Sequence, residues 1–392
     1  MTFGRQWLRE FPLDLNGTYL NHGTVGVLPR RVMAAQREML DVIERHPSRF
    51  LLRELAAFSV GAADGPSPRM RVAANEVAAF VGARGDDLVF VDNATTGINA
   101  VLRSFPFEPG DELLVTDLGY GGIARVAEFT ARERGVRLRV VPMPYPFSPD
   151  GLTRAWLSAI GPRTRLAIVD HISAESALVF PVAAIASGLR ARGVAVLVDG
   201  AHAPGAIPLD IPSLGVDYYV ANLHKWMWTP RSSGILWAPP ERQSGLHPTV
   251  ISWGLDQGFT TEFDMVGTRD PAPHLCAPAA IALFHEWGLD AVQHYNHQLA
   301  WQAAHHLAAR WQTEFATPEA LIGTMATVAL PSAAGTVWDD AVRLRTTLLD
   351  EDGIEVQMHA YREGVRVRVS AQIYNDMDDV ERLAEAVLRR VK

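Results

Sequence analysis

Short apolar runs alternate with longer segments of helical periodicity from Arg69 to about residue 240. The runs predict strands over 87–91, 112–116, 137–142, 165–170, 194–198, 218–221 and 234–237. The segments between them predict helices over 72–81, 95–103, 122–134, 152–160 and 182–192. Val, Leu and Ile fill the runs without alternation, which indicates strands buried on both faces of a mostly parallel sheet. Right-handed crossovers in such a sheet place ligand-binding groups at the carboxyl ends of the strands.

The flanking regions have a different pattern. The first 70 or so residues are irregular and helical, and a cluster of Gly, Pro and Ser at 61–68 interrupts them. After about residue 275 a long helical region runs over 277–315, followed by strands over 324–330, 354–358 and 365–370 and helices over 337–350 and 377–391. We therefore expect an N-terminal segment (1–70), a large α/β domain (71–275), and a long helix with a small C-terminal α+β domain (276–392).

Composition excludes several classes of partner. The net charge is −8 and no basic stripe is present, which argues against nucleic acid and anionic membranes. No apolar stretch reaches the ~18 residues that a membrane span needs, and the first residues do not form a secretion signal. The single cysteine, Cys276, excludes an internal disulfide and fits a reducing cytoplasm. Its sequence context resembles the entrance of a helix, which favours a structural role.

Histidines are frequent in the helical stretch after residue 290. His294 and His297 share a helix face, and His305 and His306 follow. No further ligand with suitable spacing accompanies them, so we predict no metal site.

A carboxylate and a lysine carry the strongest chemical signal. Asp199 ends the apolar run 196–198 and precedes His202, and Lys225 follows between His224 and Trp226. Each has an ordinary interpretation, because Asp-Gly is a common turn and lysine stems pack on aromatic rings. Together they are typical of a pyridoxal phosphate (PLP) enzyme. Such an enzyme needs a lysine amine for a Schiff base and a carboxylate that keeps the pyridine nitrogen protonated.

A loop between a predicted strand and a predicted helix offers a site for the cofactor phosphate. It contains Ala94, Thr95 and Thr96 in the segment 92–99. Free N–H groups and a partial positive charge at a helix N-terminus bind phosphate, and threonine hydroxyls add donors. Simple N-capping by threonine is compatible with this interpretation.

These segments resemble the class V aminotransferase superfamily of fold-type I PLP enzymes, and above all its isopenicillin N epimerase-like group. The matching segments span nearly the whole chain in the same order: 19–23, 93–97, 170–172, 199–202, 224–226, 267–271 and 368–375. The resemblance implies a mostly parallel central sheet with helices on both faces and a smaller C-terminal α+β domain. It is highly specific for the superfamily and only moderately specific for one activity.

The resemblance also implies a role for each matching residue. Lys225 would bind PLP, Asp199 would pair with the pyridinium nitrogen, and His202 would lie near the cofactor O3′. The remaining cofactor contacts would come from Ala94, Thr95, Thr96, Tyr120, Asp170, Ser173 and His224, with Tyr120 stacking on the ring. The resemblance also implies a homodimer with a shared active site, in which Thr268 of the neighbouring subunit would contact the cofactor. Arg368 would bind the carboxylate of a small amine or amino-acid substrate, which Asn21 and His22 would also contact.

Arg368 and Glu175 have competing interpretations. Arg368 also belongs to a set with Arg362 and Arg366 that could form a solvated basic face. Glu175 departs from the family pattern, which has small residues and Thr or Ser in this segment. Its carboxylate could accept a cationic substrate group, act as a base, or face solvent.

The motifs do not separate the reactions that PLP supports. Our first hypothesis is an isopenicillin N epimerase-like enzyme acting at the Cα of an amino acid or amino-acid-derived natural product. Epimerisation needs a second acid, for which His22, Tyr120 and His224 are candidates. The alternatives are a carbon–sulfur lyase, an aminotransferase, an O2-dependent oxidase or oxygenase, and a protein that only binds a ligand. Cys276 does not lie in the loop just before the Arg368 segment, where a persulfide-carrying cysteine would be expected, which disfavours a cysteine desulfurase.

Overall fold

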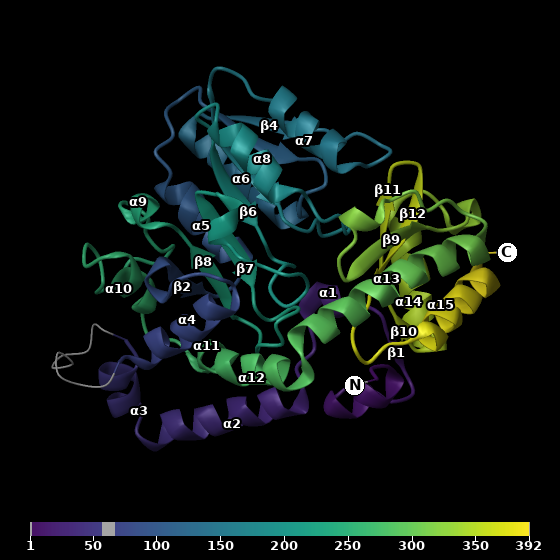
Figure 1. The fold of residues 1–392 in the computed structure, drawn as a ribbon, viewed down its shortest axis with the longest axis horizontal. Helices are drawn as coiled ribbons and strands as arrows, with labels where there is room; N and C mark the ends of the chain where they lie inside the picture. Colours follow the sequence, from purple (N-terminus) through teal and green to yellow (C-terminus); the bar gives the residue numbers. More distant parts are fainter. Residues whose placement is uncertain (1, 57–66, 392) are drawn as a thin grey trace.

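The structure is a computed structural model that describes residues 2–56 and 67–391. Its centre is a seven-stranded sheet in the order β2-β8-β7-β6-β5-β3-β4 (Figure 1). These strands are β2 (Leu88–Val91), β3 (Glu112–Thr116), β4 (Arg137–Val141), β5 (Thr164–Asp170), β6 (Ala195–Asp199), β7 (Tyr218–Asn222) and β8 (Gly234–Trp237). All neighbours pair in parallel except β8, which is antiparallel to both β2 and β7. The mostly parallel sheet is therefore confirmed.

Helices cover both faces of this sheet. Alternate strand residues pack against α4 (Arg69–Phe80), α7 (Pro149–Ser158), α8 (Val182–Arg190) and α12 (Ala277–Trp287) on one side. The other residues pack against α5 (Ala94–Ser104), α6 (Gly121–Arg134) and α10 (Phe259–Asp264). Every residue of β2, β6, β7 and β8 is buried, which explains why their sequences lack alternation.

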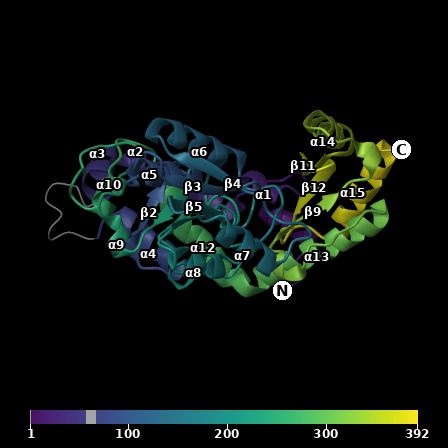
Figure 2. The same cartoon turned by 90° about the horizontal axis from the view of Figure 1, so that it is seen from above.

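A smaller α+β unit lies beside the large sheet (Figures 1 and 2). Its antiparallel sheet has the order β11-β12-β9, and α13, α14 and α15 pack on it. These elements are α13 (Leu289–Trp311), β9 (Met325–Ala329), α14 (Trp338–Asp352), β11 (Gln357–Tyr361), β12 (Gly364–Ser370) and α15 (Met377–Arg390). The N-terminus joins this unit, because β1 (Thr18–Tyr19) pairs with β10 (Ile354–Glu355).

The remaining helices and turns complete the described part of the chain. They are α1 (His22–Val25), α2 (Arg30–Arg45), α3 (Pro47–Arg49), α9 (Pro240–Gln243), α11 (Ala272–Leu275), the π-helical turn Phe50–Glu54 and the 3-10 turns Arg5–Glu10, Gly85–Asp87, Pro212–Leu214, Glu319–Leu321 and Ser332–Ala334. Within residues 2–56 and 67–391, no helix combines the length and apolarity that a membrane crossing needs.

Several predicted boundaries differ from the structure. The helical region 277–315 is two helices that break at Gly288, whose φ of 82° favours glycine, and it ends at Trp311. The predicted strand 354–358 divides between two sheets at Val356. Helix α7 starts earlier than expected because Ser148 caps it and Pro149 occupies its first turn. Residues 61–66 of the predicted break lie outside the described residues, and the domain boundaries at 70 and 275 remain predictions.

Candidate active site

The carboxyl ends of β5, β6 and β7 open into a cavity of about 630 Å³. It brings together eleven of the residues singled out in the sequence: Ala94, Thr95, Thr96, Tyr120, Asp170, Glu175, Asp199, His202, His224, Lys225 and Arg368. The large α/β unit supplies ten of them, from its strand ends, the following loops and the start of α5, and the small unit supplies Arg368 from β12. Parallel strands explain this gathering, because their carboxyl ends meet at one edge.

Lys225 and His202 face each other in this cavity. The Lys225 Nζ lies 3.1 Å from His202 Nε2, and the indole N–H of Trp226 lies 3.3 Å from His202 Nδ1. An indole N–H can only donate, so Nδ1 accepts. Burial lowers the pKa of His202 well below its ordinary value, and nearby positive charges act in the same direction. The ring is therefore neutral with its proton on Nε2, which favours the neutral form of the Lys225 amine, because only that form can accept the hydrogen bond.

The Lys225 amine is accordingly easy to deprotonate. Burial is the main cause that lowers its pKa to about 8, the charge of Arg368 adds to it, and Asp199 opposes it. His22 holds the backbone of this turn, since its Nε2 donates to the Lys225 carbonyl at 3.0 Å and its Nδ1 accepts from the Tyr374 hydroxyl at 2.9 Å. A fixed amine that loses its proton readily supplies the neutral nucleophile that Schiff-base chemistry requires.

Two carboxylates lie side by side at the sheet edge. Asp170 ends β5, Asp199 ends β6, and the two are partners in the parallel ladder. The backbone N–H of Ala201 donates to Asp199 Oδ1 at 3.0 Å. Burial raises the pKa of Asp199, while the Ala201 hydrogen bond and the charge of Lys225 oppose the shift. A buried carboxylate so placed is suited to pair with a protonated ring nitrogen.

The N-terminus of α5 lines another wall, but fewer donors are free there than expected. The Ala94 N–H donates to the Asn222 side chain at 2.9 Å, and the Thr96 N–H donates to the capping side chain of Asn93 at 2.9 Å. An anion bound here would therefore rely on Thr95 and on exchange of the Asn222 bond. The Ala94 N–H could donate to a phosphate only after its hydrogen bond to Asn222 had broken.

His224 lies at the same end of the cavity. Its Nδ1 donates to the Ser233 carbonyl at 3.1 Å, so its Nε2 is left for the cavity side. Burial is the main cause that lowers its pKa to about 4. A phosphate beside it would act against this shift, because an opposite charge favours the protonated ring.

Arg368 brings a buried positive charge to the cavity. Its side chain donates to the Ala174 carbonyl and, at 2.7 Å, to the Thr24 hydroxyl. Its Nε has no partner within the described ranges 2–56 and 67–391. Burial lowers its pKa to about 10, and Glu175 and Tyr19 oppose the shift, so the group remains a cation at neutral pH. A guanidinium held only by neutral acceptors is suited to a substrate carboxylate.

Glu175 lies on the same wall but does not neutralise Arg368. Its carboxylate is exposed to the cavity, and the ion pairs found in the described part of the chain do not include it. Burial raises its pKa, and the charge of Arg368 opposes the shift. Its backbone carbonyl accepts from the Thr327 hydroxyl at 2.6 Å, which ties this loop to the small unit. The cavity thus presents a cation and a separate carboxylate.

Four expected ligand-binding residues do not line this cavity. His22 is fully buried and both of its ring nitrogens are engaged, which also argues against its role as a second acid. The Ser173 hydroxyl bonds within its own turn. Asn21 lies behind Arg368, 3.4 Å from Nη2, and supports it rather than facing a ligand. Thr268 is exposed on the loop before α11, and its predicted contact with a second subunit remains a prediction.

Sequence reasoning missed some of the cavity wall. Thr24, Asn222 and Gln357 line it and were not predicted. It also overlooked a simple signal: the chain has only two lysines, Lys225 and Lys392, among 36 basic residues. Thr24 and Gln357 reach the cavity by folding of remote segments, which no local pattern reports.

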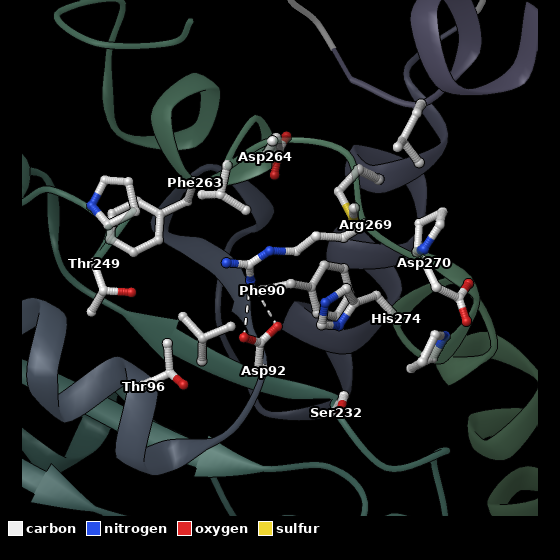
Figure 3. A pocket seen from close by; sticks show the side chains of 18 of the residues that line it. Phe90, Asp92, Thr96, Ser232, Thr249, Phe263, Asp264, Arg269, Asp270 and His274 are labelled. Atoms are coloured by element: carbon white, nitrogen blue, oxygen red, sulfur yellow. Dashed lines mark hydrogen bonds and ion pairs between the residues drawn. The ribbon is translucent and has the colours of Figure 1, made fainter. Parts of the chain in front are cut away.

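A second cavity of about 470 Å³ lies nearby and shares Thr96 with the first. Figure 3 shows Arg269 extended across it with its guanidinium directed at Asp92, and the two distances are 3.0 and 2.9 Å. Phe90 and His274 stack beside them at 4.7 Å. Its central cation is already paired, and Lys225 lies in the first cavity, so the first cavity is the better candidate for catalysis.

Cys276 and the histidines after residue 290 add no catalytic centre within the described residues. Burial raises the pKa of the Cys276 thiol to about 11, and Asp270 acts in the same direction. Such a thiol is a poor nucleophile. Among the residues that the structure describes, no three His, Cys, Asp or Glu side chains are grouped to hold a metal ion.

Comparison with known proteins settles the family. The family model described as aminotransferase class-V matches residues 33–383. The chain belongs to the class V aminotransferase family. It is 32% identical to an isopenicillin N epimerase of Streptomyces clavuligerus over 96% of this chain and 95% of that protein. It is 29% identical to a probable chloroplastic L-cysteine desulfhydrase of Arabidopsis thaliana over 94% of this chain and 82% of that protein.

Solved structures agree on the fold. The cystine C–S lyase C-DES, in complex with cysteine persulfide, superposes with a TM-score of 0.78 at 22% identity over 95% of this chain and 97% of that one. The cysteine desulfurase CsdA of Escherichia coli gives 0.78 at 22% identity over 98% of this chain and 97% of that one. The fold-type I architecture predicted from the sequence is therefore confirmed.

As a class V aminotransferase, the chain is a PLP-dependent enzyme. The cavity fits this cofactor on its own observations. It holds a deprotonable lysine amine, a buried carboxylate at a strand end, a helix N-terminus with two threonines, and an aromatic side chain, Tyr120, on its wall. An amine for the aldehyde, an acid for the ring nitrogen and donors for the phosphate are the groups that PLP needs.

Proposed function

We propose that this enzyme acts at the Cα of an amino acid or amino-acid-derived natural product, as an isopenicillin N epimerase-like enzyme. The observation that carries the proposal is the pairing of Lys225 with Arg368 in one cavity. Lys225 supplies an amine with a lowered pKa, and Arg368 supplies a buried cation without a carboxylate partner. An α-amino acid has the complementary groups, a carboxylate and an adjacent Cα–H.

The protein's part in this reaction follows from the positions of its side chains. PLP, when bound, withdraws electrons from the substrate Cα. Asp199 would pair with the cofactor ring nitrogen, and Tyr120 would cover a face of the ring. Arg368 would fix the substrate carboxylate, which restricts the directions in which the Cα–H can point. The Lys225 amine would take the proton from one face of Cα, with His202 Nε2–H orienting the amine.

Epimerisation also needs a proton donor on the opposite face of Cα. Of the candidates, His22 is engaged away from the cavity, whereas Tyr120 and His224 line it. His224 has a lowered pKa and is neutral at pH 7, so its Nε2 would have to gain a proton to donate. Tyr120 carries its own hydroxyl proton and is the stronger candidate for this role.

A carbon–sulfur lyase is the second candidate. Several relatives are named as L-cysteine desulfhydrases, one of them 29% identical over 94% of this chain. Elimination of a β-substituent needs only one base at Cα, and Lys225 alone supplies it. Aminotransferase and O2-dependent chemistry would use the same residues.

One incubation separates these reactions. The holoenzyme is mixed with isopenicillin N or with L-cysteine in deuterium oxide, with and without oxygen. Inversion with deuterium at Cα supports the epimerase, sulfide with pyruvate supports the lyase, a keto acid supports transamination, and peroxide supports oxidation. Lys225→Ala is the control, and it should abolish every product. Activity that survives in Lys225→Ala would refute the proposed site.

We also propose a homodimer with an active site shared between subunits. The exposed loop that carries Thr268 adjoins the α5 N-terminus through the Arg269–Asp92 ion pair at 2.9 Å. The loop therefore lies beside the helix end that lines the cavity. Sedimentation would show a dimer, and Thr268→Ala mixed with inactive Lys225→Ala would reveal whether Thr268 acts in the neighbouring subunit.

A further inference from the structure

Asp170 was expected among the cofactor contacts, but no chemical step described so far uses it, although it lies directly beside Asp199. The two are register partners in adjacent parallel strands, so their side chains point to the same face about 4.8 Å apart at the backbone. Each is 5% exposed. Both line the main cavity, and both line a crevice of about 20 Å³ next to it. A Cβ placed on Gly119 would lie 3.5 Å from Asp170 Oδ2, so the loop before α6 closes over this carboxyl.

The surroundings of the two carboxyls are unequal. The Asp199 anion is stabilised by the Ala201 N–H and by the charge of Lys225. Burial and the charge of Asp199 raise the pKa of Asp170 well above its ordinary value, and only the N–H of its own backbone opposes this shift. The other titratable groups near the pair are Tyr120, Glu175, His202, Tyr219 and Arg368. None of these is among the influences acting on Asp170.

We propose that Asp170 and Asp199 share a single proton, held by Asp170, so that Asp199 alone carries the negative charge offered to the cofactor ring. Two carboxylates buried at this separation do not both ionise, because each raises the free energy of the other's charged form. Asp170 keeps the proton because its partner has the better hydrogen bond and the nearer cation. Its O–H then points a donor toward Asp199, directly or through a water in the crevice, which is just large enough for one.

Asp170 is therefore a positioning residue. As a neutral acid it fixes the orientation of Asp199 and keeps the net charge of the pair at minus one. The pairing of Asp199 with the ring rests on the proposed function, whereas the sharing of the proton does not.

The pH dependence of stability tests this proposal. An acid whose pKa is raised by folding keeps its proton in the native state while the unfolded state releases it, so stability falls as pH rises from the unfolded pKa to the folded one. Asp170→Asn has no proton to lose. We expect the ratio of unfolding constants, wild type over Asp170→Asn, to grow about tenfold per pH unit between about pH 5 and 7. Urea unfolding of the full-length protein, with PLP bound and after its removal, measures this ratio.

A matched control lies immediately before β7. Asp217 is also buried, but Arg242 pairs with it at 2.7 Å. Asp217→Asn should lower stability over the whole range without such growth. A ratio for Asp170→Asn that is flat, or that falls with pH, would show an ionised Asp170 and overturn the proposal.

Two further measurements keep the test decisive if the Asn variant does not fold. Asp170→Thr retains a neutral hydroxyl donor and suits a strand, and it should reproduce the same trend. The infrared spectrum of the folded wild type at neutral pH should contain the carbonyl stretch of a protonated carboxylic acid, and the variant should lose this band. Absence of the band from the wild type refutes the shared proton. Neither measurement uses a substrate, so a failed activity assay leaves the result intact.

Discussion

Trp226 controls the charge of the catalytic amine through His202, and its replacement tests this chain of hydrogen bonds. In the wild type the indole N–H fixes His202 Nδ1 as an acceptor, so Nε2–H faces the Lys225 amine at 3.1 Å and only a neutral amine can accept. In Trp226→Phe the ring is free to carry its proton on Nδ1, and Nε2 then accepts from an ammonium. A charge-assisted bond contributes about 2 kcal/mol, from which an unpaired Nδ1–H subtracts about 1 kcal/mol. The balance is a rise of just under one unit in the pKa of Lys225.

The pH dependence of amine acylation measures this shift. With a pKa of about 8, Lys225 in the cofactor-free wild type is about 10% neutral at pH 7, roughly 200 times the fraction of an ordinary lysine. Only two lysines occur in the chain, so mass spectrometry follows Lys225 in one peptide, with Nα-acetyl-lysine in the same tube as a reference. We expect Trp226→Phe to slow acylation at pH 7 by up to about tenfold.

Trp228 supplies the control for this experiment. It is as buried as Trp226, but its indole N–H has no partner in the described part of the chain. Trp228→Phe should leave the midpoint of the acylation profile unchanged. If Trp226→Phe leaves it unchanged too, or lowers it, the argument for a fixed tautomer is wrong.

Four further outcomes are expected. Arg368→Gln should raise the KM of a carboxylate substrate about 10–100-fold, and equal KM values for an amine without a carboxylate in both enzymes would confirm the cause. If Glu175 accepts a cationic side chain, lysine should shift the cofactor spectrum at a few-fold lower concentration than norleucine, and Glu175→Gln should remove that difference. Arg71→Ala should cost about 3–5 kcal/mol in urea unfolding, because it leaves the buried Asp264, now held at 2.6 Å, without its partner. Stability should also fall as pH drops below about 6.5, because unfolding exposes buried neutral histidines such as His22, whose native pKa is about 3, and lets them bind a proton. His22→Gln should reduce this pH dependence by about tenfold per pH unit in the unfolding constant.

Local pattern in the sequence determined most of the fold and the core of the site. Unbroken Val, Leu and Ile runs predicted buried parallel strands, because a strand covered on both faces has no polar positions. Asp199 and Lys225 could be found because Asp199 ends such a strand and Lys225 lies shortly after another, and the carboxyl ends of parallel strands share one edge. The family relation, read from ordered motifs, fixed the cofactor.

Tertiary structure alone decided which polar side chains face the cavity. His22 and Asn21 belong to a matching motif, yet folding turns them toward Tyr374 and Arg368, since a buried polar group is held by whatever partner packs against it. The Ala94 N–H was expected to donate to phosphate, but it donates to the Asn222 side chain, from a strand far along the chain. The protonation of Asp170 likewise depends on its neighbour across the sheet, because burial and the distance between charges exist only once the chain has folded.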